Sequence, residues 1–198
     1  MRKFLASFAL LAVLTGCTAA PPAPPDLFYR FTGSSAEIPQ APRALNGVVM
    51  VDRFTAAGIT GGRQLLYTEA AAPNKLVEYR YHLWAEPPGD LLRERLAELI
   101  RQSGLSGSVV RPDLRVDADW VITGRILRLE QSIGAQPQAM LQMELGLRGD
   151  RDYHMTVLKP YAESVPLTED SVDATVEALN QAADRIFMQF LSDIAQAL

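Results

Sequence analysis

The first seventeen residues, MRKFLASFALLAVLTGC, constrain the chain more than any other stretch. Arg2 and Lys3 give the segment a positive start, and residues 4–13 form an uncharged, mostly apolar run. A basic start, a short apolar run and an exit of small residues are typical of a secretory signal peptide. The apolar run is shorter than the roughly 20 residues that a membrane-spanning helix needs. We therefore predict that residues 1–16 are a signal peptide.

The exit of this segment, Leu14-Thr15-Gly16-Cys17, resembles the bacterial lipobox. The resemblance implies that the chain is cut before Cys17, its only cysteine, and that the thiol and the new amino group receive acyl chains such as palmitate. An ordinary signal peptide with an incidental cysteine, or a buried N-terminal helix, is the alternative. One acyl chain gives only marginal membrane binding, whereas several anchor a protein stably. The lipobox interpretation therefore predicts a protein that is anchored to a membrane without spanning it.

The rest of the chain has the size and composition of one soluble globular domain. The chain has 198 residues, of which 48% are hydrophobic and 21% charged, as in ordinary globular proteins. The signal peptide holds two of the 19 basic residues and none of the 23 acidic ones, so residues 17–198 carry a formal charge of −6. An acidic domain without a basic cluster argues against nucleic acid as a partner. With Cys17 acylated, no thiol is left for a disulfide or a metal site.

A proline-rich tether is predicted between the anchor and the domain. Four of the eight residues that follow Cys17 are prolines. Prolines at this density favour an extended polyproline II conformation of ~3.1 Å per residue, which makes these residues a spacer of roughly 25 Å. We therefore predict an acylated cysteine with its tether at residues 17–25, and a single domain at residues 26–198.

Short strands are predicted over much of the domain. The signals are β-branched runs and the alternation of apolar and polar residues, which is clearest at residues 141–148. Turns are predicted at residues 70–74 and 148–152, and a flexible loop at residues 56–62. The predicted strands cover residues 26–31, 48–51, 63–68, 76–81, 109–110, 120–129, 141–148 and 153–158.

Two helices are predicted, one in the middle of the domain and one at its end. Asp90 is predicted to cap the first helix, whose apolar residues follow helical spacing and which stops at Gly104. Residues 169–198 give the clearest helical pattern in the chain, with a broad apolar face that includes Phe187 and Phe190. We expect that face to pack against a sheet.

Four stretches together resemble the ABC-type transport auxiliary lipoproteins, the PqiC-like partners of MCE-domain lipid transport systems. They are residues 63–67, residues 81–88 with the sequence YHLWAEPP, residues 118–122 and residues 172–179. The most specific is the Trp-Ala-Glu-Pro run that enters the first helix. The resemblance covers nearly all of the chain after the signal peptide. It implies an α/β (α+β) fold: a two-layer sandwich of one mostly antiparallel or mixed sheet, with two main helices packed on it.

The resemblance also implies a function. The family's members are lipoproteins of the Gram-negative envelope that assist the movement of phospholipid or related lipids between membranes. The expected partners are an MCE-domain protein, an ABC permease or both. An envelope lipoprotein that activates a cell-wall synthase is the alternative, because small α/β domains on proline-rich tethers serve there too.

Two further expectations concern location and assembly. Thr18 follows Cys17, where an aspartate retains lipoproteins in the inner membrane of enteric bacteria. We therefore expect the protein on the periplasmic face of the outer membrane. The short predicted strand at residues 26–31 offers unpaired backbone groups to a neighbour, which makes a homo-oligomer plausible.

No constellation of residues points to catalysis, a metal or a cofactor. The two histidines, His82 and His154, belong to no metal-binding pattern. The glycines of residues 56–62 are not followed by Gly-Lys-Ser/Thr, so this loop is not a phosphate loop. Asp117 and Asp119 are interpreted as part of a turn that enters a strand. We therefore expect no enzyme and no cofactor.

Three residues at the junction between a strand and the first helix are candidates for contact with a partner. They are Trp84, Glu86 and Pro87, an aromatic ring beside a carboxylate on a turn that proline stiffens. The alternative is a structural role in which Trp84 fills the core at the junction. The usual burial of tryptophan favours that alternative for the ring.

Overall fold

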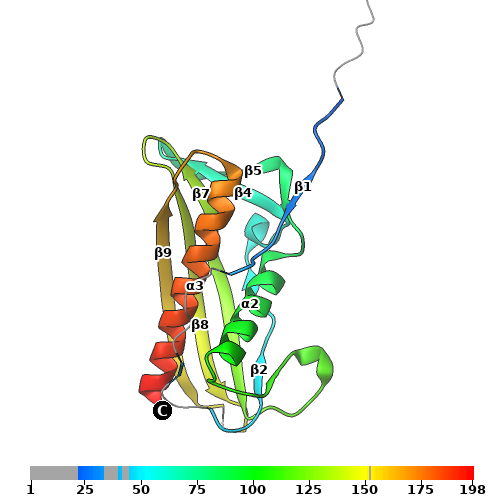
Figure 1. The fold of residues 1–198 in the computed structure, drawn as a ribbon, viewed down its shortest axis with the longest axis vertical. Coiled ribbons are helices and arrows are strands. Elements are labelled where there is room, and N and C mark those ends of the chain that lie inside the picture. The colour runs from blue at the N-terminus through cyan, green and yellow to red at the C-terminus, as the bar shows by residue number, and fades with distance from the viewer. Residues whose placement is uncertain (1–21, 34–39, 42–44, 152) are drawn as a thin grey trace, which may run out of the picture.

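The computed structural model describes residues 22–33, 40–41, 45–151 and 153–198, so Cys17 and the predicted signal peptide lie outside the described residues. The described chain forms one curled mixed sheet of nine strands with two long helices on it, an α+β fold as predicted (Figure 1). The helices are α2 (Pro88–Gln102) and α3 (Val172–Ala197). The strands and short 3-10 turns are β1 (Leu27–Tyr29), β2 (Val49–Val51), β3 (Thr55–Ala56), η1 (Gly58–Gly61), β4 (Gln64–Glu69), β5 (Ala72–Trp84), β6 (Val109–Val110), η2 (Pro112–Leu114), β7 (Trp120–Ile133), β8 (Gln138–Gly149) and β9 (Met155–Pro166).

The sheet combines antiparallel ribbons with parallel pairings between distant segments. β4 and β5 form one antiparallel hairpin, and β7, β8 and β9 form an antiparallel ribbon. β7 also lies parallel to β4 and β2, which joins the two halves of the sheet. β1 lies parallel to β5 at one edge. The predicted strand at residues 26–31 is therefore a three-residue edge strand.

The core lies between the sheet and the two helices. α3 packs along β8 and β9, and α2 packs beside it against β2 and β7. The alternate residues of β8 from Ala139 to Leu147 are fully buried, as the sequence pattern predicted. Phe187 and Phe190 of α3 are also completely buried, which confirms that the apolar face of the last helix packs against the sheet.

The prediction that Asp90 caps α2 is wrong. The helix begins at Pro88, and the backbone carbonyl of the preceding Pro87 accepts a hydrogen bond of 2.9 Å from the Asp90 amide. Proline suits the first helical position because it lacks the N–H group that would have no partner there. Asp90 lies inside the first turn, where its carboxylate is 3.4 Å from the guanidinium of Arg93.

The other helix ends follow the sequence more closely. α2 ends at Gln102, and the predicted stop Gly104 has a φ of +70°, a left-handed conformation that glycine adopts without strain. α3 begins at Val172 and not at residue 169, because Ser171 caps it. The Ser171 hydroxyl oxygen accepts a hydrogen bond of 3.1 Å from the amide of Ala174.

Several strands and turns differ from their predicted bounds. β5, β7, β8 and β9 all extend beyond the predicted ranges, because pairing with neighbouring strands carries them through polar residues that interrupt the sequence pattern. The turn between β4 and β5 consists of Ala70 and Ala71, so Pro73 of the predicted turn belongs to β5. In the same way, Arg148 and Gly149 of the second predicted turn belong to β8.

Candidate docking site

Trp84, the last residue of β5, is part of the core. Its side chain is 2% exposed, and its ring stacks on Phe31 with 4.8 Å between the centroids. Its backbone is also fixed: the Trp84 amide donates to the carbonyl of Arg63 at 2.6 Å, and the Arg63 Nε donates to the Trp84 carbonyl at 3.0 Å. The structure therefore gives this ring the structural role that the burial of tryptophan favours.

Glu86 and Pro87 lie on the surface directly beyond this anchored tryptophan. Both are exposed, whereas the next residue, Pro88, is buried. The intervening Ala85 donates its amide to the carbonyl of Tyr29 at 2.7 Å, which ties the junction to β1. The junction is thus a rigid support that presents a carboxylate and a proline ring to solvent. A partner contact through these two residues stays a prediction.

The segment that follows β1 is held by side chains of both helices. The amides of Thr32 and Gly33 donate to the Asn180 side-chain oxygen at 2.8 and 3.1 Å. Gly33 has a φ of +77°, and a Cβ there would lie 2.3 Å from the guanidinium carbon of Arg95. Arg95 in turn forms a nearly buried ion pair of 2.7 Å with Asp184. We call Asn180, Arg95 and Asp184 the N-terminal clamp, because they join β1 to α2 and α3.

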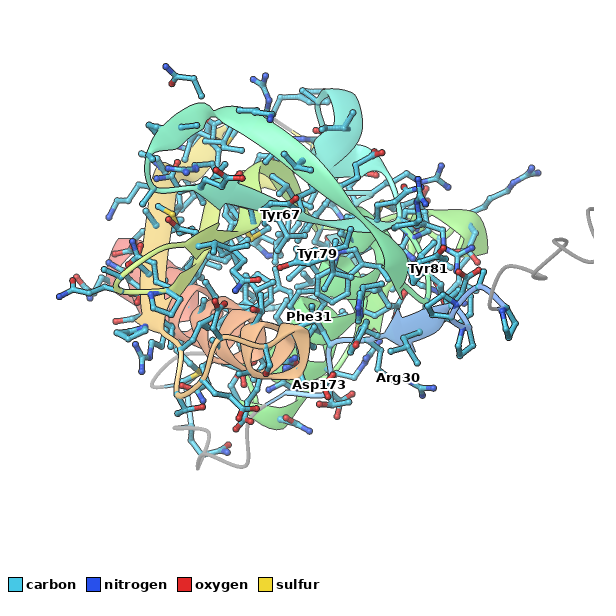
Figure 2. The ribbon with its side chains drawn as sticks, turned by 90° about the horizontal axis from the view of Figure 1, so that it is seen from above. Arg30, Phe31, Tyr67, Tyr79, Tyr81 and Asp173 are labelled. Carbon is cyan, nitrogen blue, oxygen red and sulfur yellow. The ribbon has the colours of Figure 1, made fainter. Side chains whose placement is uncertain are left out.

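Four aromatic rings follow one another where β1, β4 and β5 meet. Tyr67 and Tyr79 have their centroids 4.7 Å apart, Tyr79 and His82 5.6 Å, and His82 and Tyr29 5.8 Å. All four side chains are half-buried. Figure 2 shows Tyr67 and Tyr79 at this end of the molecule, with the start of α3 close by.

Polar contacts connect this aromatic cluster to the start of α3. The Tyr29 hydroxyl lies 2.9 Å from His82 Nδ1 and donates to Asp173 at 3.0 Å. Because that hydroxyl hydrogen goes to Asp173, His82 Nδ1 is the donor in the other contact. The Tyr79 hydroxyl donates to Gln131 at 2.6 Å, and Gln131 donates to a carboxylate, that of Asp170, at 2.9 Å.

Burial raises the pKa of these two tyrosines further above neutral pH. Desolvation, followed by the hydrogen bond and the charge of Asp173, raises the pKa of Tyr29 to about 12. Desolvation, followed by the charge of Asp170, raises the pKa of Tyr79 to about 12 as well. The Tyr29 hydroxyl donates its hydrogen bond to Asp173 at the start of α3, and the Tyr79 hydroxyl donates to Gln131 of β7.

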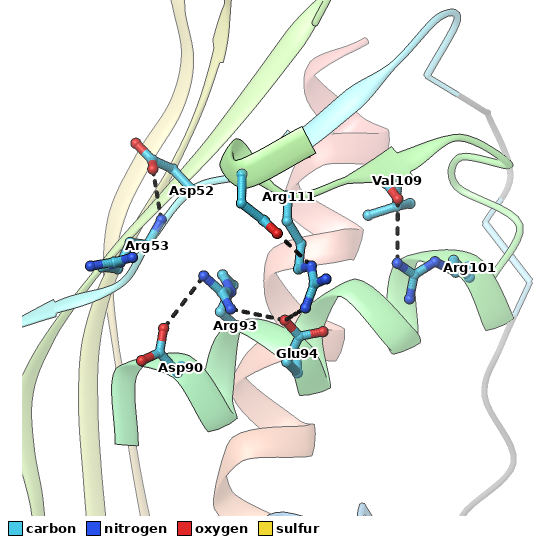
Figure 3. Close-up of polar contacts among 9 residues, drawn as sticks. Asp52, Arg53, Asp90, Arg93, Glu94, Arg101, Val109 and Arg111 are labelled. Atoms are coloured by element: carbon cyan, nitrogen blue, oxygen red, sulfur yellow. Dashed lines mark hydrogen bonds and ion pairs between the residues drawn. The ribbon is translucent and has the colours of Figure 1, made fainter. Parts of the chain in front are cut away.

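Ion pairs tie the outer side of α2 to the η2 turn, as Figure 3 shows. Arg93 lies 3.4 Å from Asp90 and 2.9 Å from Glu94, and Arg111 lies 3.6 Å from Glu94 and 3.5 Å from Asp113. The pairs of Arg111 are exposed, and exposed ion pairs contribute only ~0–1 kcal/mol each. Their carboxylate partners balance these arginines, so this side of α2 is not an open cationic patch.

The other residues considered for catalysis or metal binding lie apart from one another or take part in turns. His82 belongs to the aromatic cluster, and His154 lies beyond the end of β8. The carboxylate of Asp119 accepts the Val48 amide at 3.0 Å and pairs with Arg151 at 3.2 Å, in keeping with its interpretation as a turn residue. In the described part of the chain, no group of three or more His, Cys, Asp or Glu side chains is placed to hold a metal ion.

The clamp and the aromatic cluster are features that sequence reasoning missed. Tyr29 and Asp173 are 144 residues apart, and Arg95 and Asp184 are 89 apart, so no local pattern connects them. The available signal was the pair Asn180 and Asp184, two polar residues one helical turn apart that are both buried in α3. Buried polar groups nearly always have partners, so such a pair indicates another segment packed on the helix.

The candidate features of this α+β domain are thus surfaces and edges that suit contact with other proteins. The chain belongs to the family of ABC-type transport auxiliary lipoprotein components, whose family model matches residues 29–190. The protein is therefore a lipoprotein component of the kind that accompanies an ABC-type transport system. The family is one of auxiliary components of transport systems. Among the helices of the described residues, none has both the length and the apolar character to cross a membrane.

Solved structures share the fold at low sequence identity. A crystal structure of a Xanthomonas campestris protein from family DUF330 has a TM-score of 0.74 at 18% identity, and the match covers 86% of this chain and 96% of that one. The PelC dodecamer from Paraburkholderia phytofirmans has a TM-score of 0.50 at 13% identity, with 78% and 92% covered. A hypothetical protein from Chlamydia trachomatis also has a TM-score of 0.50 at 13% identity, with 76% and 96% covered. No curated protein matches the chain by sequence.

Proposed function

We propose that this chain is an accessory lipoprotein of an MCE-type ABC transport system that moves phospholipid or related lipids between the inner and outer membranes. The match to the auxiliary lipoprotein family over residues 29–190 carries the proposal. The signal-peptide pattern and the lipobox-like exit before Cys17 support it, because they predict export and a membrane anchor. Thr18 favours the periplasmic face of the outer membrane.

The proposed role is docking and not catalysis. The partner is an MCE-domain protein, the ABC permease or both, and the exposed Glu86 and Pro87 are the proposed contact at the strand-to-helix junction. Trp84 supports this contact from beneath, because its buried ring and its backbone hydrogen bonds hold the junction in place.

A homo-oligomer is part of the proposal. The edge strand β1 offers backbone groups on its outer side, which is a common way for strands of neighbouring subunits to pair. A protein of similar fold, PelC, is a dodecamer.

A pull-down with sizing by light scattering tests the proposed function. The full-length chain, purified from membranes in detergent, is mixed with an MCE-domain protein from the same organism. We expect a complex that Glu86→Lys weakens about tenfold, roughly 1.4 kcal/mol. Glu177→Lys is the matched control, since this glutamate is also exposed but belongs to another element, α3. A monomer that ignores the MCE-domain protein and stimulates a cell-wall synthase would reject the proposal in favour of the alternative.

A further inference from the structure

One edge of β5 is left largely open by the rest of the described chain. β5 is 13 residues long, and β4 pairs with it on one side between Ala72 and Leu83. On the other side, β1 pairs only with the last three residues, His82–Trp84. No further described strand lies beside β5. Residues 72–81 therefore form an open edge, whose outward backbone groups have no ladder partner among the described residues.

The chain's own upstream segment does not continue β1 along this open edge. Pro24 and Pro25 stand just before β1, and proline has no N–H group to donate to a ladder. Residues 22–26 are exposed and lie in no strand. Figure 1 shows this segment leading away from the body of the molecule. This upstream segment therefore does not cover residues 72–81 of the β5 edge.

Pairing along β5 is irregular, because its ladder with β4 shifts register between Ala72 and Leu76 and again between Glu78 and Leu83, and the start of the open edge is protected further by its side chains. Natural edge strands avoid unwanted pairing by means of proline and lysine, and exposed Pro73 and Lys75 stand near the start of β5. Between Leu76 and Tyr81, four of the six side chains are apolar or aromatic and half-buried. A strand that pairs along residues 76–81 gains main-chain hydrogen bonds together with apolar contact, the combination that strand addition uses.

Residues 76–81 carry one exposed carboxylate, that of Glu78, and one exposed guanidinium, that of Arg80, so the excess charge near this end of the open edge is that of Asp170 and Asp173. Asp170 and Asp173, at the start of α3, receive hydrogen bonds from Gln131 and Tyr29. Both carboxylates are exposed, and no lysine or arginine of the described residues forms an ion pair with either. The aromatic cluster is connected to them, because Tyr29 donates to Asp173, and Tyr79 donates to Gln131, which donates to Asp170. Aromatic faces and carboxylates both attract a cationic side chain.

From the open edge and the unpaired carboxylates together, we infer that residues 76–81 bind an extended segment of a partner protein that carries a lysine or arginine. The backbone of that segment pairs with β5, and its cationic side chain reaches the aromatic cluster and the carboxylates of Asp170 and Asp173. The proline-rich arm of a second copy, residues 18–25, fits poorly, because four of its eight residues are prolines without an N–H group and it contains no lysine or arginine. The identity of the partner as a transport component rests on the proposed function, whereas the recognition chemistry does not.

Hydrogen exchange of the full-length chain in detergent, measured by mass spectrometry, tests this inference. The probes are two acetylated eight-residue peptides, one of alternating valine and lysine and one of alternating valine and glutamate. We expect the lysine peptide to slow exchange at residues 76–81 and to bind at least about fivefold more tightly than the glutamate peptide. The double variant Asp170→Asn with Asp173→Asn is expected to remove this preference. Asp113→Asn, an exposed carboxylate on η2, is the control that keeps it.

Three outcomes overturn the inference. One is equal binding of the two peptides, and another is protection of a different segment while residues 76–81 exchange as before. The third is protection of these amides in the chain alone that disappears on dilution, because a second copy would then occupy the edge. None of these outcomes bears on whether the chain binds the MCE-domain protein, which the pull-down decides separately.

Discussion

Removing the ring of Phe187 tests whether α3 holds the fold together by packing on the sheet. The side chain is completely buried in the core that α3 forms with β8 and β9. Burying roughly 150–250 Å² of aromatic surface at about 25 cal/mol per Å² gives ~4–6 kcal/mol as an upper estimate. Measured Phe→Ala substitutions in cores cost ~3–5 kcal/mol, because the transfer loss and the residual cavity add. We expect Phe187→Ala to lose this amount of a total stability of ~5–15 kcal/mol.

Thermal and urea unfolding of the full-length chain measure this loss. At about 2–4 °C per kcal/mol for a domain of this size, the midpoint is expected to fall by roughly 6–20 °C. Phe28→Ala is the matched control, since Phe28 is 58% exposed and its ring contacts the guanidinium of Arg63 at the surface. Its expected cost is at most about 1 kcal/mol. A Phe187→Ala variant that melts like the parent but fails to bind its partner would refute the core assignment and make this part of α3 an interface.

Three further predictions concern the anchor, the clamp and pH. Cys17→Ser is expected to leave an uncleaved or soluble protein, and tight membrane binding in fractionation would contradict the lipobox. Asn180→Ala removes the acceptor of the Thr32 and Gly33 amides. It is expected to lower the free energy of unfolding by ~1–3 kcal/mol per amide and to speed the hydrogen exchange of both amides. The control Asn74→Ala is expected to leave that exchange unchanged. Because burial and then Asp170 raise the pKa of Tyr79 from 10 to about 12, its neutral form stabilises the fold below pH 10. That contribution is lost as pH rises through 12. Tyr79→Phe is therefore expected to flatten the decline, with rising pH, of the free energy of unfolding measured in urea. An unchanged slope of that free energy against pH would argue against this role of Tyr79.

The elements that could be predicted from the sequence are those that local periodicity determines. The alternation of β8 and the apolar face of α3 record which side chains are buried, so Leu141 and Phe187 could be assigned to the core. Gly104 could be predicted as a stop because a helix often ends in a left-handed residue. Asp90 was misassigned because Pro88, two positions earlier, supplies the start of the helix.

The parts that escaped prediction depend on pairings between distant segments. The position of β2 between β6 and β7 follows from parallel ladders that leave no local trace. The open edge of β5 is visible only once β1 is known to cover three of its residues. The N-terminal clamp likewise needs α2, α3 and the segment after β1 together in space. Pairings between distant segments bring together the surface residues on which the proposed docking function depends.

Phospholipid transfer between reconstituted inner-membrane and outer-membrane vesicles tests the proposed function most directly. The inner vesicles carry the permease, its ATPase and the MCE-domain protein, and the outer vesicles carry the full-length acylated chain. We expect transfer of labelled phospholipid to fall at least about tenfold when the chain is omitted, while ATP hydrolysis by the inner vesicles persists, because the chain contributes docking and not catalysis. Transfer that proceeds equally well without the chain would contradict the account.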